Sequence, residues 1–62
     1  MKLRKLFDHI TANGCILLRE GAKHTIVYNP ITKRTSSVPR HMEINDFLAK
    51  KICKDLAIKE VK

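Results

Sequence analysis

The side chains best suited to proton transfer near neutral pH are the three histidines, His9, His24 and His41. A neutral imidazole accepts a proton and a charged one donates it, in a pH range where few other side chains titrate. His24 has the most suggestive position, because it follows the turn of residues 21–23 and opens a run of strand-forming residues. The same position suits a residue that caps a strand or pairs with Glu20, so the pattern alone leaves catalytic and structural roles open.

Polar and aromatic side chains flank His24. Arg19 and Lys23 are close enough in sequence to hold a phosphate, Arg19 in a bidentate fork and Lys23 as a point charge, or they are simply solvated. Tyr28 shares a strand face with His24 by two-residue alternation. It would stack a base if that face is open to solvent, and it would join the core if the face points inward.

The composition favours an anionic partner. Thirteen Lys and Arg face six Asp and Glu, which gives a net charge of +7 over 62 residues. Nucleic acid is the preferred partner, since phosphate neutralisation supplies most sequence-independent affinity; a basic surface with no partner is the alternative. Salt-sensitive RNA binding is expected through Arg19, Lys23 and Arg40, with help from Lys33 and Arg34.

The sequence lacks the features that several classes of function require. A chain of 62 residues forms one small domain, residues 1–62, with too little core for a deep substrate cavity. There is no apolar run of 18 residues to span a bilayer, and the charged start "MKLRKLFDHI" differs from a secretory signal, so a cytoplasmic location and no membrane role are predicted. No phosphate-cradling glycine loop, nucleotide-binding fingerprint or nucleophile elbow is present, and no cofactor is predicted.

The cysteines do not indicate a metal site. Cys15 and Cys53 stand 38 positions apart without CxxC spacing, and no histidine shares a helical or hairpin spacing with them. Both are expected to be reduced and buried as small apolar residues. His41 is expected to pack in a loop and His9 to be solvated on a helix surface.

The elements that must position His24 can be read from periodicity. Leu3, Leu6, Phe7 and Ile10 predict a helix over about residues 2–13, closed by Asn13-Gly14. "CILLR" (15–19), "HTIVYN" (24–29) and the weaker "TSSVP" (35–39) predict strands, with "ITKRT" (31–35) as a polar loop. A second amphipathic helix is predicted from the four-residue repeat of apolar side chains between residues 44 and 56, with Asn45 as its N-cap.

The order of elements predicts an α+β fold: a helix, a three-stranded antiparallel sheet and a second helix. The connections between the strands are too short for parallel crossovers, so the sheet is expected to be an antiparallel meander. Both helices are expected on one face of the sheet, which leaves the other face open.

With this layout, the chain resembles the HicA toxin family over nearly its whole length. The resemblance is carried by "NGC" (13–15), "LLREGAKHTIVYNP" (17–30), "VPRH" (38–41) and "EINDFLAKKICKDLAI" (43–58). The family's hairpin has Arg, two residues, Gly, Ser and His, and the same step runs here from Arg19 to His24. The chain departs from it at Gly21, which comes one place early, at Ala22-Lys23 in place of Gly-Ser, and at Cys15, where an aromatic residue is usual.

The resemblance implies a double-stranded-RNA-binding-domain-like fold and a toxin of a toxin-antitoxin pair. It further implies a metal-independent, histidine-dependent messenger RNA endonuclease that a HicB-type antitoxin neutralises, with His24 as the catalytic histidine. Two alternatives stay open: a non-catalytic RNA-binding module that uses the same basic face, and a small interaction protein with an acidic protein partner.

Overall fold

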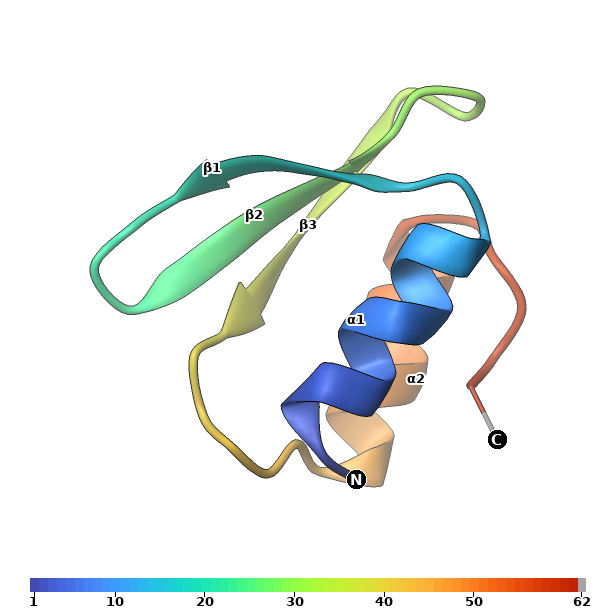
Figure 1. Cartoon of the computed structure of the whole chain (residues 1–62). Helices are drawn as coiled ribbons and strands as arrows, with labels where there is room; N and C mark the ends of the chain where they lie inside the picture. Colours follow the sequence, from blue (N-terminus) through green and yellow to red (C-terminus); the bar gives the residue numbers. More distant parts are fainter. Residues whose placement is uncertain (62) are drawn as a thin grey trace.

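The protein consists of two helices packed on one side of an antiparallel sheet (Figure 1). The computed structural model describes residues 1–61. Over that range the elements are α1 (Leu3–Ala12), β1 (Ile16–Glu20), β2 (His24–Asn29), β3 (Arg34–Pro39) and α2 (Asp46–Asp55). The predicted α+β class and the helix, three-stranded sheet, helix order are confirmed, and the arrangement is consistent with a double-stranded-RNA-binding-domain-like fold.

Helix α1 forms where the apolar periodicity predicts it, to within one residue at each end. Leu6 and Ile10 are fully buried, while Leu3 and Phe7 pack at the margin of the core. The helix ends where Gly14 takes a φ of +88°. Glycine adopts this left-handed conformation without the steric cost that a Cβ would add, so the chain can turn sharply into β1.

Helix α2 begins at the predicted cap. The Asn45 side-chain oxygen accepts a hydrogen bond from the Phe47 backbone N–H at 2.7 Å, which satisfies one of the free donors of the first turn. Asp46 adds a negative charge at the positive end of the helix dipole. The face of α2 that packs on the core buries Ile52 and Cys53 completely.

The sheet has the strand order β1, β2, β3, so β2 is central and the other two strands are edges. The pairing of β2 with β3 is regular from His24 opposite Pro39 to Asn29 opposite Arg34. The pairing of β1 with β2 shifts by one residue between Leu17 and Arg19. Such an extra residue is a β-bulge, which bends an edge strand and increases its twist.

The core lies between the helices and strands β2 and β3. Among the described residues its buried hydrophobic members are Leu6, Ile10, Cys15, Val27, Val38, Ile44, Ala49, Ile52, Cys53 and Leu56. Buried Asn29 links the sheet to the end of α2, because its side-chain N–H donates to the Leu56 carbonyl at 2.8 Å. Strand β1 stays largely outside the core, with Ile16, Leu17 and Leu18 exposed by 49%, 52% and 55%.

Some boundaries and one side chain differ from the expectation. Strand β1 starts at Ile16 rather than Cys15, and β3 starts at Arg34 rather than Thr35, because Arg34 still pairs with Asn29. The prediction that His9 is solvated is wrong. His9 is half-buried and its Nε2 lies 2.7 Å from the Lys59 carbonyl oxygen, because the chain after α2 returns to α1, which helical periodicity cannot reveal.

Candidate active site

His24 is the first residue of β2 and its side chain is exposed. Its neighbours Thr25 and Val27 point into the core, so by alternation His24 and Tyr28 belong to the face of the sheet that the helices leave uncovered. The question about Tyr28 is thereby answered: it is half-buried on the open face. It stands four residues along the strand from His24, roughly 13 Å away at the usual rise of a strand.

A tight turn presents His24 at the end of the hairpin. The Gly21 backbone N–H donates to the His24 carbonyl at 2.7 Å, which leaves Ala22 and Lys23 as the two residues of the loop. A Cβ added at Gly21 would lie 3.2 Å from the same carbonyl oxygen. Glycine therefore fits position 21 better than a residue whose Cβ would crowd this oxygen.

The end of β3 is tied to this turn. The Arg40 backbone N–H donates to the Lys23 carbonyl at 3.2 Å, and the Arg40 guanidinium donates to the Gly21 carbonyl, also at 3.2 Å. His41 comes next in the chain. Since His24 pairs with Pro39, the last residue of β3, His41 lies just beyond the end of the strand that neighbours His24.

These segments enclose a shallow concavity of about 490 Å³, lined by Ala22, Lys23, His24, Arg40 and His41. The lining combines two imidazoles with an ammonium and a guanidinium, and it has no carboxylate. Such a surface attracts an anion and offers groups that can exchange protons near neutral pH. Arg19 lies opposite Ile26 on β1, so it belongs to the same open face as His24.

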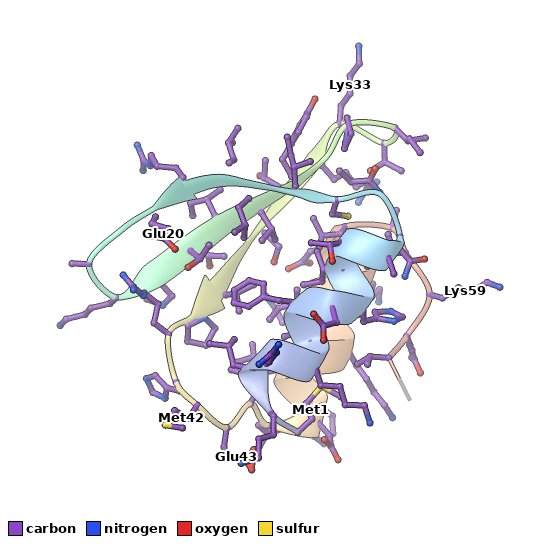
Figure 2. The ribbon with its side chains drawn as sticks, viewed as in Figure 1. Met1, Glu20, Lys33, Met42, Glu43 and Lys59 are labelled. Carbon is purple, nitrogen blue, oxygen red and sulfur yellow. The ribbon has the colours of Figure 1, made fainter. Side chains whose placement is uncertain are left out.

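Two of the predicted RNA-binding residues lie elsewhere. Lys33 is in the loop between β2 and β3, and Arg34 pairs with Asn29 at the far end of β2. In Figure 2, Lys33 and Glu20 lie at opposite ends of the sheet, and Glu20 marks the end next to the turn that carries His24. The structure therefore brings Lys23 and Arg40 to His24, but it does not bring Lys33 and Arg34 there.

A larger groove of about 610 Å³ lies on the outer side of α2, lined by Phe47, Lys50, Lys51, Lys54, Ala57, Ile58 and Glu60. None of these side chains is an imidazole, the group best suited to exchange protons near neutral pH. The smaller concavity around His24 is the better candidate for acid-base chemistry, because it holds both the imidazoles and the cations. Within residues 1–61, no three His, Cys, Asp or Glu side chains gather in a way that could hold a metal ion, and no helix is long and apolar enough to cross a bilayer.

A family comparison accounts for most of the chain. Residues 3–58 match the family described as the HicA toxin of bacterial toxin-antitoxin systems. The chain belongs to the HicA toxin family. The resemblance inferred from the sequence motifs is thereby confirmed, while comparisons with curated proteins and with solved structures find no match.

The hairpin geometry explains how this HicA toxin tolerates its unusual turn. Gly21, one place earlier than the family's glycine, closes the hairpin through its own N–H, and the two loop positions take Ala22 and Lys23. The side chain of Lys23 gains a place beside the concavity. The departure therefore adds a cation next to His24 without changing where His24 stands in the strand.

The proximity of His41 was missed by sequence reasoning, which treated it as a loop residue. His41 is 17 positions from His24 in the sequence, yet both line the concavity of this HicA toxin. A signal was available: in an antiparallel pair joined by a short loop, the start of one strand lies beside the end of the next. Applied to the predicted second and third strands, that rule places the residues after Pro39 beside His24.

Proposed function

We propose that this HicA toxin is a ribonuclease that cleaves messenger RNA, with His24 as the base that starts the reaction. One observation carries the proposal: an exposed histidine shares a concavity with Lys23 and Arg40 in a chain of net charge +7. The shallow, open surface suits a polymer, which needs to lie across the site rather than enter a pocket. Independence from metal ions rests on the family resemblance.

The chemistry follows from the groups present. Neutral His24 takes the proton of an RNA 2′-hydroxyl, and the resulting oxygen attacks the adjacent phosphorus. The P–O5′ bond then breaks, which gives a 2′,3′-cyclic phosphate and a free 5′-hydroxyl end. Lys23 and Arg40 hold the phosphate and offset the negative charge that grows on its oxygens. General acid-base catalysis of this kind contributes typically ~10²–10⁴-fold in rate.

The partner that the family implies is an antitoxin, and we infer a HicB-type protein that covers the face carrying His24. The support is geometric. The catalytic groups lie on an open surface rather than in a closed pocket, so a bound protein can block RNA without a conformational change in the toxin. The proposed location of the toxin is the cytoplasm, where it would meet messenger RNA and the antitoxin.

The variant His24→Ala tests the catalytic role. We expect RNA cleavage in EDTA to fall at least about a hundredfold, because the imidazole supplies proton transfer. Stability should change by no more than about 0.5 kcal/mol, since the side chain is exposed. Cleavage rate and urea unfolding are measured on the same preparation.

The test also separates the proposal from the alternative RNA-binding module. A wild-type chain that retains labelled RNA without cleaving it would favour the module. A folded His24→Ala protein that cleaves at nearly the original rate would remove His24 from catalysis. The variant His9→Ala is the matched control, because His9 is a histidine whose ring contacts Lys59 instead of lining the concavity.

A further inference from the structure

His41 is held beside His24 by the chain on both sides of it. Immediately before it, Arg40 makes two hydrogen bonds to the turn, one from its backbone and one from its guanidinium. Immediately after it, the Met42 carbonyl accepts a hydrogen bond from the Leu3 backbone N–H at 2.9 Å. His41 therefore occupies a segment anchored at the hairpin on one side and at α1 on the other.

The His41 ring itself is free to meet a substrate. Its side chain is exposed, and among the described residues it lies in no hydrogen bond or ion pair. A histidine that served only to pack the loop would be expected to bury its ring or to use its nitrogens. A group that acts on a substrate needs an anchored backbone and an unoccupied side chain, and His41 has both.

The reaction proposed for His24 also needs a group that donates a proton. When the P–O5′ bond breaks, the leaving oxygen must receive a proton, and a positioned acid makes this step faster. With His24 acting as the base, the remaining groups around the concavity that can donate a proton are Lys23, Arg40 and His41. An ammonium or a guanidinium is a weak acid that holds its proton at neutral pH, so a second histidine is the group suited to donate there.

We propose that His41 is the general acid of this ribonuclease and protonates the leaving 5′-oxygen while His24 deprotonates the 2′-hydroxyl. The proposal rests on the ribonuclease function above. The balance is complete: the O2′–P bond forms, the P–O5′ bond breaks, His24 gains a proton and His41 loses one. Exchange with water then returns both histidines to their starting states. The charged groups that face His41 are Lys23, Arg40 and, after it accepts the proton, His24.

The test uses two oligonucleotides that differ at one atom. After the main cleavage site has been mapped on RNA, that site is placed as a single ribonucleotide in a DNA strand, with either oxygen or sulfur as the bridging 5′ atom. A sulfur leaving group departs readily without a proton. The rate of chain cleavage is measured in EDTA for the wild type, His41→Ala and His24→Ala, with His9→Ala as control.

We expect His41→Ala to lose at least about a hundredfold on the oxygen substrate and to stay within about threefold of wild type on the sulfur substrate. His24→Ala should lose activity on both substrates, because the base is needed in either case. The pH profile of the wild type on the oxygen substrate should be bell-shaped, and His41→Ala should lose the limb that falls at high pH.

Other outcomes are equally informative. Equal losses of His41→Ala on the two substrates would make His41 a positioning or binding residue, and unchanged rates would remove it from the site; either result overturns the proposal. In both cases a large loss in His24→Ala would leave the ribonuclease function intact. A wild-type protein that cleaves neither substrate nor the RNA used for mapping would instead overturn the proposed function.

Discussion

Burial divides the reactive side chains of this toxin into two groups. His24 and His41 are exposed to solvent, whereas Cys15 and Cys53 are buried. Removal from water disfavours the charged thiolate and raises the pKa of both thiols above their ordinary value of 9.0; for Cys15, neighbouring Cys53 adds to the effect. The cysteines therefore serve as core residues, and the proposed chemistry belongs to the open end of the sheet.

The raised pKa values predict loss of stability at alkaline pH. Unfolded thiols ionise near their ordinary value and folded thiols only at higher pH, so the folded state binds more protons in between. The stabilising contribution is complete below about pH 9 and is lost as the pH rises through the raised values. Urea unfolding at about pH 8 and about pH 10 should show a larger drop in stability for the wild type than for a Cys15→Ala, Cys53→Ala double variant, because all other ionisable groups are the same in the two proteins. Equal drops would show that the thiols do not contribute.

At the scale of single residues, the sequence pointed to part of the candidate site. The turn and the strand-forming residues around His24 carried enough signal to single it out, and the structure places Lys23 and Arg40 beside it as phosphate-binding candidates. The position of His41 depends on the strand pairing of His24 with Pro39, a contact between distant parts of the chain. Periodicity describes each segment separately, so it could not place His41; only the pairing of neighbouring antiparallel strands could do so.

At the level of elements, the helices and strands were predicted well. Apolar periodicity, strand-forming residues and caps each act within one short segment of the sequence. The bulge between Leu17 and Arg19 was not predicted, because it depends on how β1 meets β2 rather than on β1 alone. The cap at Asn45 was predicted, because it requires only one side chain and the backbone two residues later.

That cap gives a measurable expectation. Replacing Asn45 by alanine removes the hydrogen bond to the Phe47 N–H and should lower the free energy of unfolding by about 1 kcal/mol. Asn45→Asp is the matched control, since aspartate caps helices as well as asparagine. Chemical denaturation should rank the proteins with the aspartate variant near the wild type; an alanine variant of unchanged stability would mean that water replaces the cap without cost.

At the scale of the whole molecule, two pairs of cationic side chains lie at opposite ends of the sheet. Lys23 and Arg40 lie at the end that carries His24, and Lys33 and Arg34 lie at the other. An RNA strand that reaches both ends has to cross the open face of the sheet past Tyr28. The length of the RNA should therefore decide which cations contribute to binding.

Salt dependence tests this arrangement in the His24→Ala protein, in which RNA cleavage is expected to be slow. Each phosphate contact contributes about 0.7 to the slope of log affinity against log salt for a single strand. Adding Lys23→Gln should reduce the slope by nearly that amount for short and long RNAs. Adding Lys33→Gln should do so only for RNA long enough to span the sheet, such as about 12 nucleotides rather than about four. An unchanged slope for Lys23→Gln on every RNA would exclude this lysine from the binding surface.

The half-exposed strand β1 has a consequence for the behaviour of the toxin in solution. Ile16, Leu17 and Leu18 lie on an edge strand that, among the described residues, has a neighbouring strand on one side only. Such edges favour sheet-to-sheet aggregation. The net charge of +7 opposes this by repulsion between molecules. Salt shortens the range of that repulsion, to about 10 Å at 0.1 M, and leaves the apolar contact intact. Light scattering of the free toxin should therefore rise with added salt, so that the same ions that release RNA from the protein would drive its molecules together.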